Sequence, residues 1–225
     1  MITPQVSLDT ASSGRLQALK IPFACSNTSD LAKLHLVWPA QAEAGVILDA
    51  YCEHPFHLTI DIILLILEDN KVEWMYAPTD SGAVRLAMSE IFAADSISLG
   101  LRRIHPHRLA TLSLTIALGI IFTHSQHDRA FLLFSAASSL LTLSSSHHLT
   151  EPTIASVEAL HLMVTFLFAT GQADSVRAAW PLLGSCMRLA SALGLHRDCG
   201  KWGIVGEDKA HRETLAWECI TYDVL

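Results

Sequence analysis

Histidine and cysteine are the residues of this chain that could bind a metal ion. Its 225 residues include 12 histidines and 5 cysteines. One histidine pair, His105 and His107, precedes the apolar run 109–122, and a second pair, His124 and His127, follows it. About 20 Å of helix would separate the pairs, whereas the ligands of a tetrahedral zinc site all lie within bonding distance of the metal. No cysteine pair stands near either histidine pair, so we predict polar helix ends and no metal site.

The triplet His-Arg-Asp at 196–198 matches the catalytic loop of protein kinases, in which the aspartate is the base. A kinase loop continues to an asparagine that binds magnesium, but Cys-Gly-Lys-Trp-Gly follows here at 199–203. The chain also has no Gly-rich phosphate loop upstream, no Gly-x-Ser-x-Gly elbow, no Walker loop and no dinucleotide fingerprint. We therefore predict no catalytic residue and no enzyme activity.

Composition indicates a folded intracellular chain. Apolar residues make up 51% of the sequence and charged residues 16%, which allows a large core. The formal net charge is −7, whereas a DNA-binding module usually carries a basic surface. Residues 1–14 contain no basic segment followed by an apolar one and so do not predict a secretory signal. The odd number and irregular spacing of the cysteines favour a reduced compartment over a disulfide scaffold.

Hydrophobic periodicity predicts an all-α fold, an irregular multi-helix bundle. Residues 1–45 show weak periodicity and several Ser, Thr and Pro breaks, so we expect a weakly structured lead-in. From residue 79 onward, apolar residues recur at helical spacing, and no convincing alternation typical of strands is present. Helices are expected to start after the capping residues 79–82, at Pro106, at Asp128, at Thr150-Glu151-Pro152, at Asp174 or Ser175, and near Arg212.

The clearest helix lies in the segment 178–198, where it runs into a Gly-Leu-His-Arg-Asp exit at 194–198. An apolar stripe at alternating steps of four and three runs along it, formed by Val176, Trp180, Leu183, Met187 and Ala190. Gly194 stands where this helix should end, because glycine adopts the left-handed conformation at little cost. A tryptophan on an apolar stripe is more often part of the core than of a ligand site. We therefore favour burial in the core for Trp180 and for Trp217 in the last helix. The alternative is that Trp180, Trp202 and Trp217 form a wall of an effector pocket between helices.

The segment 178–198, AAWPLLGSCMRLASALGLHRD, resembles part of the regulatory (middle homology) domain of fungal zinc-cluster transcription factors. In that family, a helix with Ala-Trp, Leu-Gly and Arg-Leu-Ala runs into Gly-Leu-His-Arg. The segments 152–163 and 212–223 are similar to the neighbouring helices of the family, and 47–51 loosely resembles the start of the domain. The resemblance implies that residues 46–225 form the N-terminal part of such a regulatory domain.

The function implied by this resemblance is regulation of DNA-templated transcription in the nucleus. A regulatory domain, or a fragment of one, would act there through helix–helix contacts or through a small effector. We expect the residues that match the family's motifs to be mostly structural, with Arg188 or Arg197 paired to Glu213. The matching residues are Trp180, Gly184, Arg188, Ala190, Gly194, Leu195, His196, Arg197, Asp198, Trp202, Glu213, Trp217 and Asp223.

The sequence departs from the family in two ways. The DNA-binding half of the family is a basic N-terminal region with a six-cysteine binuclear zinc cluster, whereas Cys25 and Cys52 are isolated here. The resemblance therefore implies that this chain binds no cofactor. It also implies that DNA contact requires a zinc cluster, which this chain lacks. Candidate partners are family members, in a homo- or hetero-oligomer. The chain also stops at Leu225, before the segment with which the family continues. We expect a truncated domain whose uncovered apolar faces drive association.

The alternative is a small helical membrane protein, because the mean hydropathy is +0.36. The apolar run 109–122 would span about 21 Å as a helix, however, against about 30 Å for the hydrocarbon core of a bilayer. A second run, 155–170, is interrupted by Glu158 and His161. We therefore favour a helical core without membrane insertion. A third alternative, a helical enzyme or carrier with a pocket, lacks paired catalytic groups.

Overall fold

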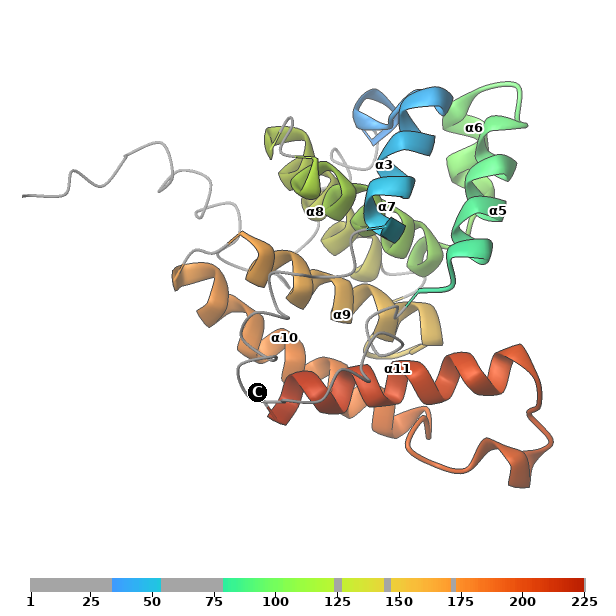
Figure 1. Cartoon of the computed structure of the whole chain (residues 1–225), viewed down its shortest axis with the longest axis vertical. Coiled ribbons are helices and arrows are strands. Elements are labelled where there is room, and N and C mark those ends of the chain that lie inside the picture. The colour runs from blue at the N-terminus through green and yellow to red at the C-terminus, as the bar shows by residue number, and fades with distance from the viewer. Residues whose placement is uncertain (1–33, 54–78, 124–126, 144–146, 171–172, 225) are drawn as a thin grey trace, which may run out of the picture.

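The computed structural model describes residues 34–53, 79–123, 127–143, 147–170 and 173–224. All regular elements in these ranges are helices, which confirms the predicted all-α, irregular multi-helix fold (Figure 1). Residues 1–33 of the predicted lead-in lie outside the described residues. The helices are α3 (Gln41–Glu53), α5 (Ser81–Phe92), α6 (Ile97–Arg103), α7 (Pro106–Phe122), α8 (His127–Leu141), α9 (Ile154–Ala169), α10 (Ala173–Ala192), the short 3₁₀ helix η2 (Cys199–Trp202) and α11 (Glu207–Val224).

Two central helices, α7 and α9, organise the fold. α7 contacts α3, α8 and α9, and α9 also contacts α10 and α11. Every residue from Leu109 to Ile121 in α7 and from Ser156 to Leu167 in α9 is buried. A helix that is apolar around its whole circumference must be covered on all sides. The other helices therefore pack around these two, with α3, α5 and α6 at one end of the molecule and α10 and α11 at the other (Figure 1).

The apolar run 109–122 forms most of α7 and is covered by the helices around it. Among the described residues, no helix combines the length and the apolar character that crossing a membrane requires. The hydropathy of this segment is therefore explained by its place in the core.

Capping side chains define two helix starts where the sequence predicted them. Asp80 accepts the N–H of Gly82 at 2.8 Å and caps α5. His105 caps α7, since its Nδ1 accepts the N–H of His107 at 3.2 Å and Pro106 follows as the first helical residue. Each cap satisfies one of the N–H groups that a helix start leaves without an intrahelical partner.

The predicted start of α9 at Thr150 is wrong. The cap is Thr153, whose side chain accepts the N–H of Ser156 at 3.2 Å, while Ser156 Oγ accepts the N–H of Thr153 at 3.0 Å. The Thr150 hydroxyl instead donates to the carbonyl of His147 at 3.0 Å. Pro152 disfavours the helical conformation at the residue before it, so the helix begins only after the proline.

Three other helices begin earlier than the sequence predicted. α8 begins at His127, α10 at Ala173 and α11 at Glu207, so the predicted starting residues lie inside these helices. In α11 the first turn carries Glu207 and Asp208, which favour the positive end of the helix dipole. The buried residues of α11 begin only at Leu215, and a prediction based on apolar periodicity therefore misses its polar first turns.

The packing of α3 on α7 depends on Gly119. A Cβ atom added to Gly119 would overlap the backbone carbonyl and the side chain of Ile47 in α3. Ile47 is itself buried, and a backbone carbonyl cannot rotate away from such a contact. The absence of a side chain at this position therefore sets the distance between the two helices.

We predict that Gly119→Ala lowers the free energy of unfolding by about 1–3 kcal/mol, because the overpacked contact forces α3 and α7 apart. Gly45→Ala in α3 is the matched control, since nothing lies within 4 Å of a Cβ at that position. The control should gain up to about 1 kcal/mol from helix propensity. Urea unfolding of both variants measures the difference, and equal effects would contradict the close contact.

Candidate functional site

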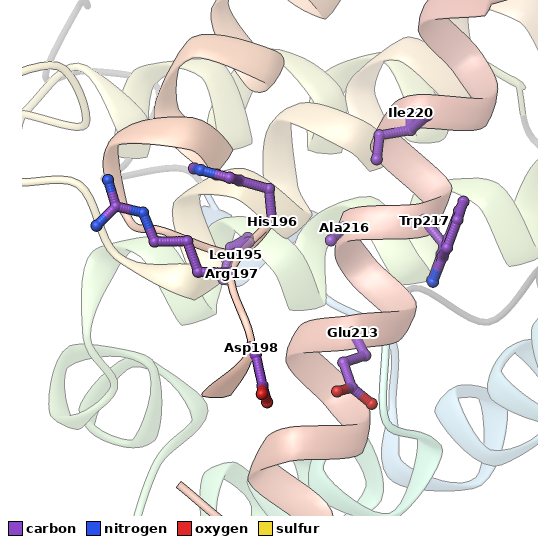
Figure 2. A pocket seen from close by; sticks show the side chains of 8 residues that line it. All are labelled: Leu195, His196, Arg197, Asp198, Glu213, Ala216, Trp217 and Ile220. Atoms are coloured by element: carbon purple, nitrogen blue, oxygen red, sulfur yellow. The ribbon is translucent and has the colours of Figure 1, made fainter. Parts of the chain in front are cut away.

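A half-open groove of about 370 Å³ lies between the loop segment 195–198 and α11 (Figure 2). The carboxylates of Asp198 and Glu213 lie toward one end of it, and His196 and Ile220 lie toward the other. The eight lining residues are Leu195, His196, Arg197, Asp198, Glu213, Ala216, Trp217 and Ile220. The groove thus combines apolar and charged side chains from two segments that are close in sequence.

The end of α10 directs the chain into this groove. The N–H of Leu195 donates to the carbonyl of Ala190 and the N–H of Gly194 to that of Ser191, both at 3.0 Å. These two bonds form a Schellman motif, which requires a left-handed residue at the position of Gly194. Gly194 has φ +69°, as the sequence predicted.

Contacts with residues 199–202, which follow it in the chain, hold the segment 195–198 in place. Asp198 Oδ1 accepts the N–H of Gly200 at 3.0 Å and so caps η2. Cys199 Sγ lies 3.6 Å from the carbonyl oxygen of Arg197, to which it donates. The Arg197 guanidinium lies 5.7 Å from the ring centroid of Trp202, close enough for a cation–π interaction. A Cβ on Gly194 would lie 3.4 Å from that same ring.

The predicted link from Arg188 or Arg197 to Glu213 is wrong. Glu213 pairs with Lys209, four residues earlier on α11, at 3.6 Å. The Arg197 side chain points away from Glu213 (Figure 2). Its guanidinium instead lies near the Trp202 ring. Arg188 lies along its own helix, with Nη1 3.5 Å from the Cβ position of Gly184. Lys209 is a neighbour of Glu213 because residues four positions apart lie on the same side of a helix. Neither arginine side chain extends to Glu213.

The structure brings six of the thirteen motif residues into the groove. They are Leu195, His196, Arg197, Asp198, Glu213 and Trp217. Gly194 and Trp202 support the loop beside it, and the remaining residues, Trp180, Gly184, Arg188, Ala190 and Asp223, lie elsewhere on α10 and α11. Ala216 and Ile220 also line the groove and were not among the predicted site residues. Their spacing from Glu213 and Trp217 on one helix is the signal that could have identified them.

The predicted burial of Trp180 and Trp217 is wrong. Trp180 is 59% exposed and Trp217 is 55% exposed. The face that α10 buries contains Ala179, Leu182, Leu183, Cys186, Leu189 and Ala190, and α11 buries Leu215, Ala216, Glu218, Cys219 and Tyr222. Both faces include small residues, which let neighbouring helices approach closely. The tryptophans therefore lie on the outer sides of their helices.

Two histidine–carboxylate pairs join α9 to α11. Glu158 Oε1 lies 2.5 Å from His211 Nε2, and this hydrogen bond raises the pKa of His211 above its usual value. His161 Nε2 lies 3.7 Å from Glu218 Oε2, and both side chains are only 2% exposed. Burial lowers the pKa of His161 to about 4 and raises the pKa of Glu218 to about 8. At neutral pH, burial therefore favours the uncharged form of both members of the inner pair.

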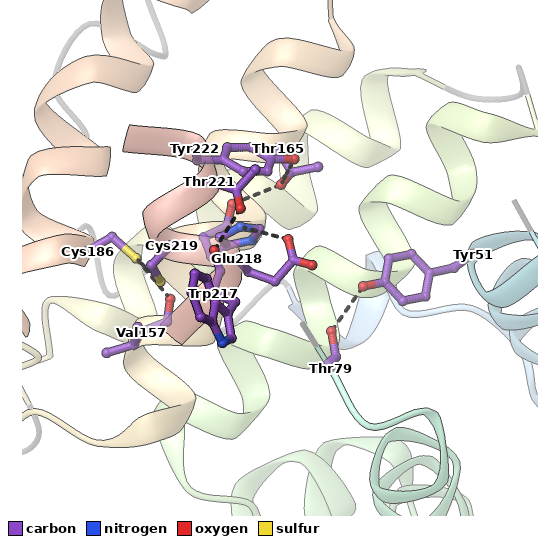
Figure 3. Close-up of polar contacts among 11 residues, drawn as sticks. Tyr51, Thr79, Val157, Thr165, Cys186, Trp217, Glu218, Cys219, Thr221 and Tyr222 are labelled. Atoms are coloured by element: carbon purple, nitrogen blue, oxygen red, sulfur yellow. Dashed lines mark hydrogen bonds and ion pairs between the residues drawn. The ribbon is translucent and has the colours of Figure 1, made fainter. Parts of the chain in front are cut away.

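The inner pair belongs to a larger polar contact between these helices. Thr165 Oγ1 of α9 donates to the Tyr222 hydroxyl of α11 at 3.2 Å (Figure 3). In the sequence, Glu158 and His161 stand out as interruptions of an apolar run, but Glu218 does not. Glu218 stands three residues after Leu215 and four before Tyr222. This spacing places it on the buried stripe of α11 and is the signal that could have found it.

His107 has a local structural role at the helix starts. His107 Nδ1 lies 2.8 Å from the hydroxyl of Thr153 and thereby joins the start of α7 to the start of α9. His124 lies outside the described residues. Within the described part of the chain, no three His, Cys, Asp or Glu side chains gather as metal ligands would.

Residues 102–225 match the fungal specific transcription factor domain. The chain belongs to this family. No curated protein and no solved structure matches the chain. The matched part of this fungal transcription factor domain includes α7 to α11 and therefore the whole groove. Residues 46–101, which the sequence analysis also assigned to the domain, lie outside the match, although buried residues of α3 and α5 belong to the same core.

In the fungal transcription factor domain we predict that Gly194→Ala lowers the free energy of unfolding by about 1–2 kcal/mol, because alanine is strained at positive φ. Gly203→Ala is the matched control: Gly203 has φ +74° but nothing within 4 Å of its Cβ position. The loss of stability in Gly203→Ala therefore measures the backbone strain alone. In Gly194→Ala, the close contact of the new Cβ with the Trp202 ring adds a further loss. Thermal or urea unfolding measures both variants, and a larger loss at Gly203 would contradict this account of the loop.

We also predict that Glu218→Gln stabilises the domain increasingly as the pH rises. The unfolded Glu218 carboxyl ionises above its ordinary pKa of 4.5, whereas the folded one stays protonated up to about pH 8. The contribution of this one carboxyl to stability is therefore fully present below pH 4.5 and falls by about 1.4 kcal/mol per pH unit between these two values. Glutamine does not titrate and avoids this loss.

The measurement is the difference in unfolding free energy between Glu218→Gln and the wild type from pH 5 to pH 8. His161 has the opposite pH dependence, since its lowered pKa costs stability as the pH falls from 6.5 to about 4. That contribution is present in both proteins and largely cancels in the difference. A difference that is constant with pH would contradict a protonated, buried Glu218.

Proposed function

We propose that this chain is a non-catalytic regulatory domain in nuclear transcription and that the groove between 195–198 and α11 is its contact site. Membership of the fungal specific transcription factor domain family supports the role in transcription. The observation that carries the choice of site is that six motif residues from two separate segments line one groove. In this proposal, a separate zinc cluster would bind DNA. The residues of the groove require no cofactor.

The shape of the groove favours a helix as its occupant over a small effector. Small-molecule pockets bury most of their ligand's surface, whereas this groove is half open to solvent. On α11 the exposed side chains of Glu213, Trp217 and Ile220 follow one another at steps of four and three. This is the spacing with which one helix packs its side chains against another. A helix of a family member, in a homo- or hetero-oligomer, is the partner that we propose.

Trp217 is the residue expected to contribute most to such a contact. Tryptophan is enriched among the residues that dominate binding energy at interfaces, particularly near the centre of the buried patch. More than half of its surface is exposed, and it stands between Glu213 and Ile220 along α11. A partner helix would cover this surface, and the carboxylates of Asp198 and Glu213 would select basic side chains at one end of the groove.

The test compares Trp217→Ala with Trp180→Ala, fusing each chain to an unrelated DNA-binding domain and measuring reporter transcription in a fungal cell. The two tryptophans have similar exposure, but only Trp217 lines the groove. We expect Trp217→Ala to change reporter output several-fold and Trp180→Ala to leave it near the wild-type level. Circular dichroism and expression level control for folding. Equal outputs from the two variants would contradict the groove as the contact site.

A further inference from the structure

Two thiols face each other where α10 packs on α11. Cys186 Sγ of α10 lies 3.5 Å from Cys219 Sγ of α11 (Figure 3). Cys186 is completely buried and Cys219 is 1% exposed. The two residues are 33 positions apart in the sequence, so only the packing of the helices brings them together. Neither residue lines the groove, and neither is among the thirteen motif residues named above.

The closed structure keeps these thiols unreactive. Cys186 Sγ also lies 3.5 Å from the carbonyl oxygen of Val157 in α9, to which it can donate. The hydrogen bond with Cys219 and the burial of the side chain both raise the pKa of Cys186 well above its usual value. Because the thiolate is the reactive form of cysteine, oxidation requires α11 to open first.

The interface that α11 makes with α9 favours such opening. Within the described residues, Glu218 Oε1 and both ring nitrogens of His161 are buried without a hydrogen-bond partner. Burying polar atoms in this way makes the closed arrangement less stable than a fully hydrogen-bonded one. α11 also lies at the edge of the molecule, where local opening requires less disruption than in the centre (Figure 1).

We propose that Cys186 and Cys219 form a dithiol that hydrogen peroxide converts into a disulfide, which fastens α11 to α10. One thiolate attacks the peroxide O–O bond, so that an S–O bond forms and, with one proton, a water molecule leaves. The second thiol attacks the resulting sulfenic sulfur, so that the S–S bond forms, the S–O bond breaks and a second water leaves. Two thiols are oxidised, and one peroxide is reduced to two waters.

The geometry suits this bond when the helix closes again. The sulfur atoms stand 3.5 Å apart and must approach to about 2.05 Å. Side-chain rotation and a small shift of α11 supply the difference, and neither side chain has to leave the interface. The bond would hold α11 in place beside the segment 195–198, whatever occupies the groove between them.

Cys199 provides a matched control for the pair. It is also buried, at 2% exposure, and lies in the same C-terminal part of the chain. Its Sγ donates to the carbonyl of Arg197 instead of facing another thiol. If burial alone controlled oxidation, the three cysteines would be oxidised to the same extent. If the Cys186–Cys219 contact controls it, only these two cysteines would form a disulfide.

The experiment treats the reduced, full-length chain with hydrogen peroxide and follows intact mass, peptide maps and melting temperature. We expect the loss of two hydrogen atoms, a peptide that links Cys186 to Cys219, and a rise in Tm of about 5–10 °C that a reductant reverses. Cys186→Ala and Cys219→Ala should abolish the link, and Cys199→Ala should keep it. Thiols that stay reduced, separate conversion to sulfinic acids, or linkage of other cysteines instead would each overturn the proposal.

A second variant tests the opening step. Tyr222→Phe removes the hydroxyl that accepts the hydrogen bond of Thr165 and so loosens the C-terminal end of α11. We expect the link to form roughly five times faster, which corresponds to the loss of one hydrogen bond. An unchanged or slower rate would contradict control of the reaction by α11.

Discussion

The structure depends on the burial of α9 from every side. Its residues from Ser156 to Leu167 have no exposed face, so each polar side chain among them needs a partner from a neighbouring helix or from its own backbone. Glu158, His161 and Thr165 follow one another at steps of three and four along the helix. On α11, His211 pairs with Glu158 and the Tyr222 hydroxyl accepts from Thr165, while Glu218 lies 3.7 Å from His161 without a hydrogen bond between them. The polar residues of α9 therefore fix the position and register of α11.

This arrangement connects the core to the groove. α11 presents its buried residues to α9 and α10 and its exposed residues Glu213, Trp217 and Ile220 to the solvent. The opposite wall comes from the Schellman motif at Gly194, which depends only on local backbone geometry. One wall of the groove is thus set by long-range packing and the other by a local turn. A change in the packing of α9 on α11 would move one wall and leave the other in place.

The sequence predicted those features that depend on neighbouring residues. Asp80, Pro106 and Gly194 act within a few positions of themselves, and their roles at helix ends are confirmed. The start of α9 shows the limit of this reasoning, because Thr150 and Thr153 are both able to cap and only the conformation before Pro152 decides between them. Pairs such as His161 and Glu218 lie more than 50 residues apart, and no local pattern specifies which buried polar residue meets which.

The sequence predicted only part of the face that α10 buries, whereas the buried face of α11 with Leu215, Cys219 and Tyr222 follows from the spacing of these residues in the sequence. Of the stripe predicted for α10, Leu183 and Ala190 are buried as expected, but Val176 and Trp180 are exposed, and a second stripe with Ala179, Cys186 and Leu189 is buried in their place. The large side chains of the first stripe bury more apolar area, whereas the small residues of the second permit α10, α9 and α11 to pack closely. The structure follows the second. Close packing through small residues leaves Trp180 and Trp217 outside and, in the same step, brings Cys186 within 3.5 Å of Cys219. The exposed tryptophans and the buried dithiol are therefore two consequences of one choice of interface.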